Sequence, residues 1–272
     1  MTAPTTPTPS PLPPPPEPSG ATPTAALRPR PRLWAIFVYT LQSCVPPRRW
    51  AAVIAACVGS VLFGLLARAI DTGPDRAFAY VATEGILSLA VPIAALVIGD
   101  AVLGAEIRGG TFMFTWMTPS PVWQIVLGRW LGGSLVALVT IVPACALAAL
   151  VSGARDGLAQ IVVASAAGAV AYVALFIAIG CLTRRTAVWS LAIVFLVERL
   201  LGAALTGIAQ ISPQWESRAA FVGLLDNPPT RLIREGVPSG GSALIRLMVI
   251  SFVALAVATW RMRHLRLTGA SD

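Results

Sequence analysis

The residues of this chain that could do chemistry lie in two places, a polar insert between two apolar stretches and a charged pair inside another apolar stretch. The insert, residues 104–121, combines Glu106 with glycines, aromatic residues and Pro119. The charged pair is Glu198 and Arg199. Neither place holds a Ser–His–Asp set, paired inward carboxylates or zinc-ligand spacing. The sequence therefore predicts no catalytic site and no enzyme.

The composition of the basic residues bears on nucleotide chemistry. All 20 of them are arginines. A Walker A loop needs a lysine to reach the phosphates, so we expect no ATP hydrolysis by this chain through a P-loop. The single histidine, His264, has no second ligand type nearby, and the four cysteines show no paired spacing: Cys44, Cys57, Cys145 and Cys181. We expect neither a metal site nor a bound cofactor in the chain itself.

The hydropathy of the chain identifies the elements that must position these residues. Apolar residues make up 56% of the sequence and charged residues 12%, about half the charge of a soluble domain. The apolar residues form runs of about twenty, long enough to cross a hydrocarbon core of roughly 30 Å as helices. The sequence therefore predicts an all-α integral membrane protein with six transmembrane helices, at Ala51–Ile70, Val81–Leu103, Ile125–Val151, Leu158–Leu182, Ala187–Leu205 and Ala243–Trp260.

The arginines give the expected orientation. With the N-terminus inside, twelve arginines lie on the cytoplasmic side and six on the other, as the positive-inside rule requires. Because they flank the spans and form no single basic face, the net charge of +8 does not indicate nucleic-acid binding. We expect a multi-pass protein of the plasma membrane with both termini cytoplasmic. Its arginine-only, Ala/Gly/Pro-rich composition is typical of a high-GC bacterium.

The remaining segments have their own patterns. Residues 1–32 hold 12 of the 23 prolines and few large apolar side chains, which predicts a disordered cytoplasmic tail. Residues 33–45 place apolar side chains on one helix face but are too short to cross, so we expect an interfacial helix. The 206–242 segment is a long extracytoplasmic loop in which we expect short helices. Residues 261–272 form a basic cytoplasmic tail.

In this topology the segment 105–122 is cytoplasmic. On its own it fits an ordinary loop with aromatic residues at the water–lipid boundary. Its pattern, however, resembles the permease subunit of type-2 ATP-binding-cassette (ABC-2) transporters. The motif residues are Glu106-x-x-x-Gly110-Thr111, Thr118-Pro119 and Gly128-Arg129. The chain departs from the family at Val122 and Trp123, where a basic residue is common.

The resemblance implies six spans, an N-terminal interfacial helix and two cytoplasmic ends. It also implies that 105–122 is a coupling segment that docks into a separate ABC ATPase subunit, which binds ATP and Mg. The expected partners are that ATPase, a second permease copy in a homodimer or a related permease, and the lipid bilayer. The expected function is outward transport of a small hydrophobic compound, such as a drug, antibiotic or lipid-like molecule. The coupling residues implied are Glu106, Gly110, Thr111, Phe112, Trp116, Pro119, Gly128 and Arg129.

Glu198 and Arg199 fall near the middle of a predicted span. Each charge costs about 2.5–3.5 kcal/mol at that depth, so both side chains should face other helices or water. They either line the substrate route or the contact between two copies, or hold helices in register as a structural ion pair. Glu84, near the outer end of the second span, is a weaker candidate that interface snorkelling also explains.

Two other functions remain open from the sequence. An ion-gradient-driven secondary transporter would use Glu198 as its titrating group, although no internal repeat is evident. A non-transporting membrane scaffold or immunity protein would bind an ATPase without flux, or bind none.

Overall fold

The computed structural model describes residues 32–44, 49–70, 74–104, 106, 120–153, 157–183, 185–194, 196, 198, 210, 212–226 and 239–264. All of them belong to one compact unit, Pro31–Asp272. Of the predicted tails 1–32 and 261–272, residues 1–31 and 265–272 lie outside these residues, and so does most of the coupling segment. Every regular element among the described residues is helical. This agrees with the predicted fold class, since only helices and closed barrels satisfy all backbone groups in lipid.

The helices follow the chain in this order: α1 (Arg32–Cys44), α2 (Arg49–Ile70), α3 (Pro74–Tyr80), the π-helix η1 (Val81–Ala90), α4 (Val91–Gly99), the π-helix η2 (Asp100–Gly104), α7 (Val122–Ser152), α8 (Leu158–Leu182), α9 (Thr186–Ala192), α12 (Pro213–Gly223) and α13 (Gly240–Arg263).

Four helices in the described part of the chain are long and apolar enough to cross a membrane: Ala77–Leu103, Val122–Ser152, Leu158–Leu182 and Gly240–Arg263. They contain four of the six predicted spans, and the predicted span Leu158–Leu182 coincides with α8. The first predicted span lies in α2, a helix of 22 residues outside this group. Of the fifth, little beyond α9 is described. Four apolar helices are therefore compatible with a membrane-embedded protein, and six spans remain a prediction.

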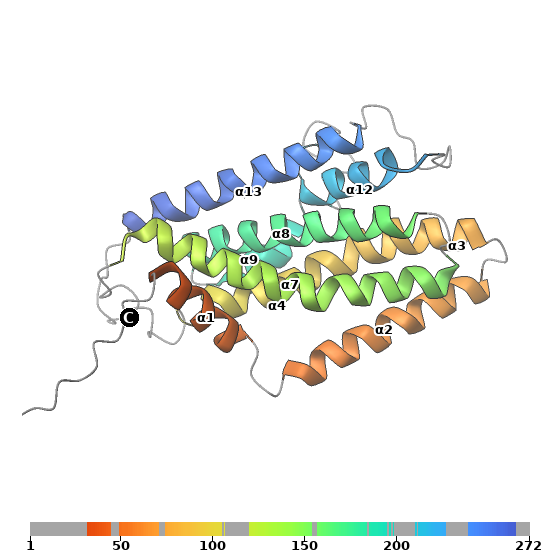
Figure 1. Cartoon of the computed structure of the whole chain (residues 1–272), viewed down its shortest axis with the longest axis horizontal. Helices are drawn as coiled ribbons and strands as arrows, with labels where there is room; N and C mark the ends of the chain where they lie inside the picture. The colour runs from red at the N-terminus through yellow and green to blue at the C-terminus, as the bar shows by residue number, and fades with distance from the viewer. Residues whose placement is uncertain are drawn as a thin grey trace, which may run out of the picture. The chain divides into compact units, whose positions relative to one another are not determined.

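The long helices form a bundle around α8, which packs against α13, α7, α4 and α12 (Figure 1). One end of the bundle holds α1, Gly104 and the start of α7; we call it the α1 end. The other end holds α3, α12 and the start of α13, and we call it the α12 end. The α12 helix confirms the short helix expected in the 206–242 segment. It packs against α8 and α13.

The second apolar stretch alternates between π and α geometry along its length. The π-helix η1 passes into α4 at Val91, and Pro92 occupies the first turn of α4. Proline has no N–H to donate, so a change in the hydrogen-bond pattern at this point is expected. The Ser88 hydroxyl donates to the Thr83 carbonyl over 2.7 Å, five residues back along this π-helix. Pro92 thus lies where the helix changes from π to α geometry.

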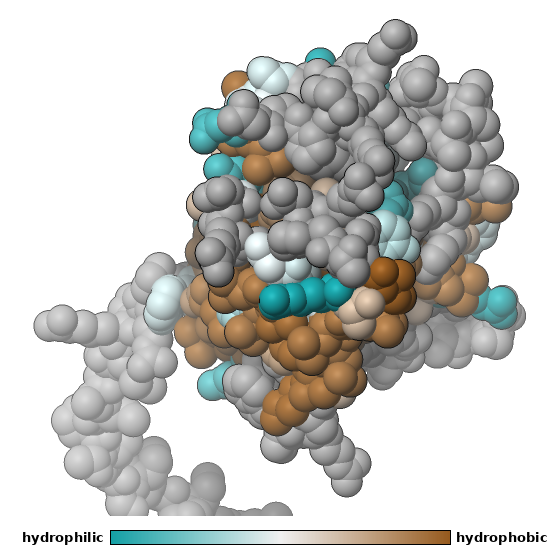
Figure 2. Space-filling view, turned by 90° about the vertical axis from the view of Figure 1, so that its right-hand side faces the viewer, coloured by the Kyte–Doolittle hydropathy of each residue, from teal (hydrophilic) through white to brown (hydrophobic). Residues whose placement is uncertain are grey.

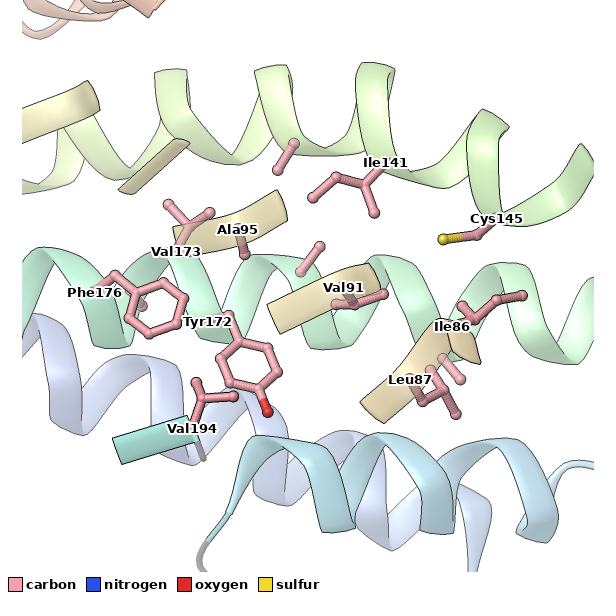
Figure 3. Close-up of a cluster of buried hydrophobic side chains, with 14 of the residues drawn as sticks. Ile86, Leu87, Val91, Ala95, Ile141, Cys145, Tyr172, Val173, Phe176 and Val194 are labelled. Atoms are coloured by element: carbon pink, nitrogen blue, oxygen red, sulfur yellow. The ribbon is translucent and has the colours of Figure 1, made fainter. Parts of the chain in front are cut away.

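Small residues bring the helices close together in the core. A Cβ on Gly99 would lie 2.7 Å from Cβ of Phe176, so α4 and α8 approach closely there. Tyr172 and Phe176 of α8 stack with their ring centroids 5.5 Å apart (Figure 3). In lipid such packing replaces the hydrophobic effect as the force between helices. Many large apolar side chains on the outside of the bundle are exposed. Figure 2, seen from the α12 end, shows apolar residues over much of the described surface on that side.

Candidate functional site

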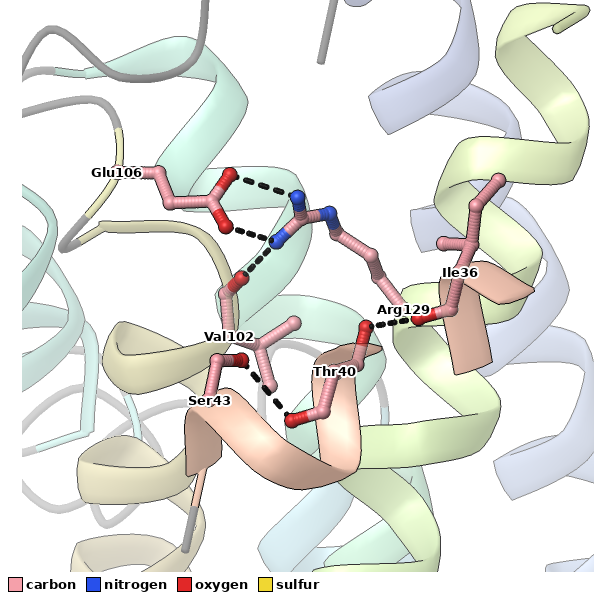
Figure 4. A network of polar contacts seen from close by, with 6 residues as sticks. All are labelled: Ile36, Thr40, Ser43, Val102, Glu106 and Arg129. Carbon is pink, nitrogen blue, oxygen red and sulfur yellow. Dashed lines mark hydrogen bonds and ion pairs between the residues drawn. The ribbon is translucent and has the colours of Figure 1, made fainter. Parts of the chain in front are cut away.

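The α1 end of the bundle contains a buried arginine–glutamate pair. Arg129 of α7 donates from Nη1 and Nη2 to the two carboxylate oxygens of Glu106, over 3.0 and 2.6 Å (Figure 4). Its Nη1 also donates to the Val102 carbonyl over 2.6 Å. The Arg129 side chain is 1% exposed and that of Glu106 is 12% exposed. The two charged residues of the predicted coupling motif are therefore in direct contact.

The local structure explains why these residues meet. Glu106 follows η2 by two residues, and Arg129 lies two turns into α7, the helix that returns the chain into the bundle. Val102 belongs to η2, so its carbonyl orients the guanidinium from the same segment that carries Glu106. A planar guanidinium fits a carboxylate with two parallel hydrogen bonds. A buried charge needs such a partner, because an unpaired charge in this position costs several kcal/mol.

Tyr39 of α1 joins this network. The guanidinium carbon of Arg129 lies 5.7 Å from the centre of the Tyr39 ring, within the range of a cation–π contact. The negative charge of Glu106 raises the pKa of Tyr39, and partial burial and a hydrogen bond to Glu106 raise it further, while Arg129 opposes the shift. Three elements, α1, η2 and α7, thus meet around the Arg129–Glu106 pair.

Two glycines of α7 let α1 approach. A Cβ on Gly128 would lie 3.0 Å from the Ile36 side chain, and a Cβ on Gly132 would lie 2.9 Å from that of Thr40. Thr40 is fully buried, and its hydroxyl donates to the Ile36 carbonyl over 2.8 Å (Figure 4). Gly128 and Gly132 form a Gly-x-x-x-Gly pattern, which permits a close contact between helices, and the helix that makes this contact is α1.

The rest of the predicted coupling segment is mostly outside the described residues. This applies to Gly110, Thr111, Phe112, Trp116 and Pro119. The segment's last part is described: Pro121 is extended and precedes α7, and its carbonyl accepts from the Gln124 amide over 2.9 Å. Trp123, one of the departures from the family pattern, is 47% exposed at this end.

Glu198 forms a second buried polar site. Its carboxylate accepts hydrogen bonds from the Tyr172 hydroxyl over 2.6 Å and the Ser212 hydroxyl over 2.8 Å. The backbone amide of Gln214 donates to Ser212 Oγ over 3.1 Å, so Ser212 also caps α12. Glu198 is 8% exposed. This side chain is therefore buried, whereas Arg199 lies outside the described residues.

The same polar site extends into η1. Gln214 donates from Nε2 to the Ser88 hydroxyl over 2.6 Å, which connects α12 to the second apolar stretch. Glu84 of η1 pairs with Arg218 of α12 over 3.2 Å, at 36% and 18% exposure of the two side chains. Glu84 and Glu198 thus both bind groups of the segment 206–242, although their partners differ.

Sequence reasoning missed the neutral members of both sites. Tyr39 is in the predicted interfacial helix, where an aromatic residue gave no separate signal. Tyr172 is the only tyrosine in its apolar stretch, and that isolation could have marked it. Ser212 followed by Pro213 is a helix-start pattern that also could have been read.

Comparison of the chain with protein-family models and with curated proteins found no match to either. The resemblance to ABC-2 permeases therefore rests on the residues of the motif.

Proposed function

We propose that this chain is the membrane permease of an ATP-driven exporter of the ABC-2 type. It moves a small hydrophobic compound outward, and a separate ATPase subunit supplies the energy. Two copies form the transport unit. The observation that carries this proposal is the buried pair of Glu106 and Arg129.

The pair supports the proposal because of where its members lie. Glu106 opens the segment that would dock into the ATPase, and Arg129 is part of a long apolar helix. Two hydrogen bonds and burial join them firmly, so a displacement of the segment is transmitted to α7. An ATPase that binds two states of the segment with different affinity would shift the populations of the transmembrane bundle by that difference.

Tyr39 and the two glycines of α7 extend this connection to α1. The exposed Trp123 leaves an apolar side chain at the same end for contact with a partner. The proposed ATPase contact therefore includes the apolar side chain of Trp123, and the buried Glu106–Arg129 pair connects the contact segment to α7.

The experiment is a pull-down of the tagged full chain from its native membrane in mild detergent, followed by identification of the proteins that accompany it. We expect a P-loop ATPase whose hydrolysis rate changes when it is reconstituted with this chain. Glu106→Ala should reduce that stimulation about tenfold. Asp226→Asn, an exposed carboxylate in the described part of the α12 end, is the matched control and should leave it unchanged. Repeated recovery of the chain alone from several detergents would contradict the proposal.

A second candidate function is a carrier driven by an ion gradient. It is favoured by the buried Glu198 carboxylate, which accepts hydrogen bonds from the hydroxyl groups of Tyr172 and Ser212. A carrier of this kind would transport without any ATPase and would lose activity in Glu198→Gln. Transport by proteoliposomes containing this chain alone, driven by a pH gradient, would select it over the exporter.

A further inference from the structure

A cavity lies between three helical segments on one side of the bundle. α2 touches α7 near the α12 end, where a Cβ on Gly64 would lie 2.8 Å from the Ala148 carbonyl oxygen. Towards the α1 end the two helices diverge (Figure 1). The space between α2, the η1–α4 segment and α7 is a cavity of about 520 Å³, and Cys44 at the end of α1 also borders it.

The described residues that line this cavity are uncharged. Its hydroxyl side chains are Ser60 and Thr140, and Thr140 Oγ1 donates to the Val136 carbonyl of its own helix over 2.7 Å. Such a lining offers a polar ligand little to bind, and it is complementary to hydrocarbon. Small residues, among them Gly85, Ala90 and Ala94, leave the space open.

The cavity is long in the direction of the helices. Its lining on α7 runs from Val136 to Ala148, roughly 18 Å at the rise of an α-helix. Large apolar side chains of the flanking helices, Leu62, Val97 and Val139, are exposed beside it. In a bilayer this rim faces acyl chains, and the long axis of the cavity follows the direction in which those chains run.

We propose that this cavity binds one acyl chain of a membrane phospholipid. The Gly64–Ala148 contact closes the α12 end, so the chain lies with its methyl end there and its head group at the α1 end. This binding does not depend on the transport function.

The test uses the full chain in nanodiscs that contain phosphatidylglycerol with a photoreactive diazirine in the middle of one acyl chain. After irradiation, mass spectrometry locates the labelled peptides. We expect labelling of residues 136–148 and 85–101. Ala94→Trp, which fills the cavity, should reduce labelling there about tenfold. The control Val249→Trp replaces an exposed apolar residue of α13, far from the lining, and should not.

Size-exclusion profile and melting temperature show whether Ala94→Trp is folded; if it is not, Thr140→Phe takes its place. Unchanged labelling in a folded cavity-filling variant would overturn the assignment of the lipid to this site. Cross-links between two copies through this face, without lipid labelling, would show that a second copy of the chain covers the cavity and would overturn the proposal. Displacement of the probe by a transported compound, but not by unlabelled phosphatidylglycerol, would show that the cavity binds the transported compound and would also overturn the proposal.

Discussion

At the scale of single residues, Arg129 and Glu106 determine the character of the α1 end. The guanidinium is 1% exposed and has a carboxylate and a carbonyl as partners. Removal of one member of a buried pair leaves the other charge uncompensated, which destabilises more than removal of both. Exposed pairs behave differently, since solvent screens them.

We predict that Glu106→Leu destabilises the protein by about 3 kcal/mol, because it leaves the Arg129 charge buried without its carboxylate. The apparent melting temperature in detergent should fall by about 10 °C, as measured by tryptophan fluorescence. The double variant Glu106→Leu/Arg129→Met should recover most of this loss, because no charge then remains buried.

Glu84→Leu is the comparison for this prediction, since the Glu84–Arg218 pair is more exposed. Its destabilisation should be at most about 1 kcal/mol. Equal destabilisation by Glu84→Leu and Glu106→Leu would mean that burial does not set the strength of the Arg129 pair.

Tyr39 gives a pH-dependent prediction. Its pKa is raised above 10.0 in the folded protein, mainly by the charge of Glu106. A raised pKa favours the protonated form, so its contribution to stability is present below the unfolded pKa and is lost as pH rises through the folded pKa. The ultraviolet titration of the wild type minus that of Tyr39→Phe isolates this phenol. In Glu106→Gln its midpoint should move down towards 10, and an unmoved midpoint would remove Glu106 as the cause.

At the scale of elements, α1 is fixed to α7 through glycines. Gly132 leaves room for Thr40, and Gly128 leaves room for Ile36. The position of α1 relative to the bilayer is a prediction, while its contact with α7 is observed. A helix attached in this way moves with α7.

We predict that Gly132→Ala loosens α1, because the new methyl would lie 2.9 Å from Thr40. Amide hydrogen exchange of residues 32–44 should become about tenfold faster. Gly59→Ala is the matched control, since nothing lies within 4 Å of a Cβ at that position. It should leave exchange in α1 as it is; an equal effect of both variants would show that the contact is not what protects α1.

The helical elements were more predictable than their junctions. Runs of apolar residues identified α8 to the residue and α7 and α13 to within three residues at each end, because hydropathy reports burial in lipid directly. The π-helices η1 and η2 could not be predicted, since nothing in the local pattern distinguishes i→i+5 from i→i+4 pairing. The Gly-x-x-x-Gly pattern of α7 indicates a close contact but does not identify the helix that makes it, so the contact with α1 could be found only from the structure.

In the two polar sites, the charged residues could be predicted from the sequence and their partners could not. Its position inside an apolar span identified Glu198, because a charge there must find a partner. Glu106 and Arg129 were identified by the motif that resembles ABC-2 permeases. The identity of those partners depends on contacts between segments distant in sequence. Tyr172 and Ser212 lie 26 and 14 residues from Glu198, and both donate to it.

At the scale of the whole molecule, the two polar sites lie at different positions along the bundle. The Arg129 pair is at the α1 end, Glu198 binds Tyr172 near the middle of α8, and Glu84 pairs with Arg218 of α12 towards the other end. The proposed topology assigns these ends to the cytoplasm and the exterior. A cytoplasmic ATPase can reach only the first.

We predict that the ends of α13 are accessible from opposite sides of the membrane. A cysteine at Ser239 should react with a membrane-impermeant maleimide in intact cells, whereas one at His264 should react only after permeabilisation. The wild type, with its buried or half-buried cysteines, measures the background. Labelling of both positions from outside would show that α13 does not cross, and the reverse pattern would invert the orientation and exclude a cytoplasmic ATPase at Glu106.

The π-helical stretch Val81–Ala90 has a consequence for how such a chain can evolve. Each backbone carbonyl there accepts a hydrogen bond from the amide five residues further along. Loss of one residue changes this spacing to the four residues of an α-helix, and the backbone hydrogen bonds are kept. A deletion in α8, by contrast, would rotate half of a tightly packed helix against four neighbours. The second apolar stretch should therefore accept single-residue insertions and deletions more readily than α8 does. Each such change would rotate the side chains that follow it in the helix.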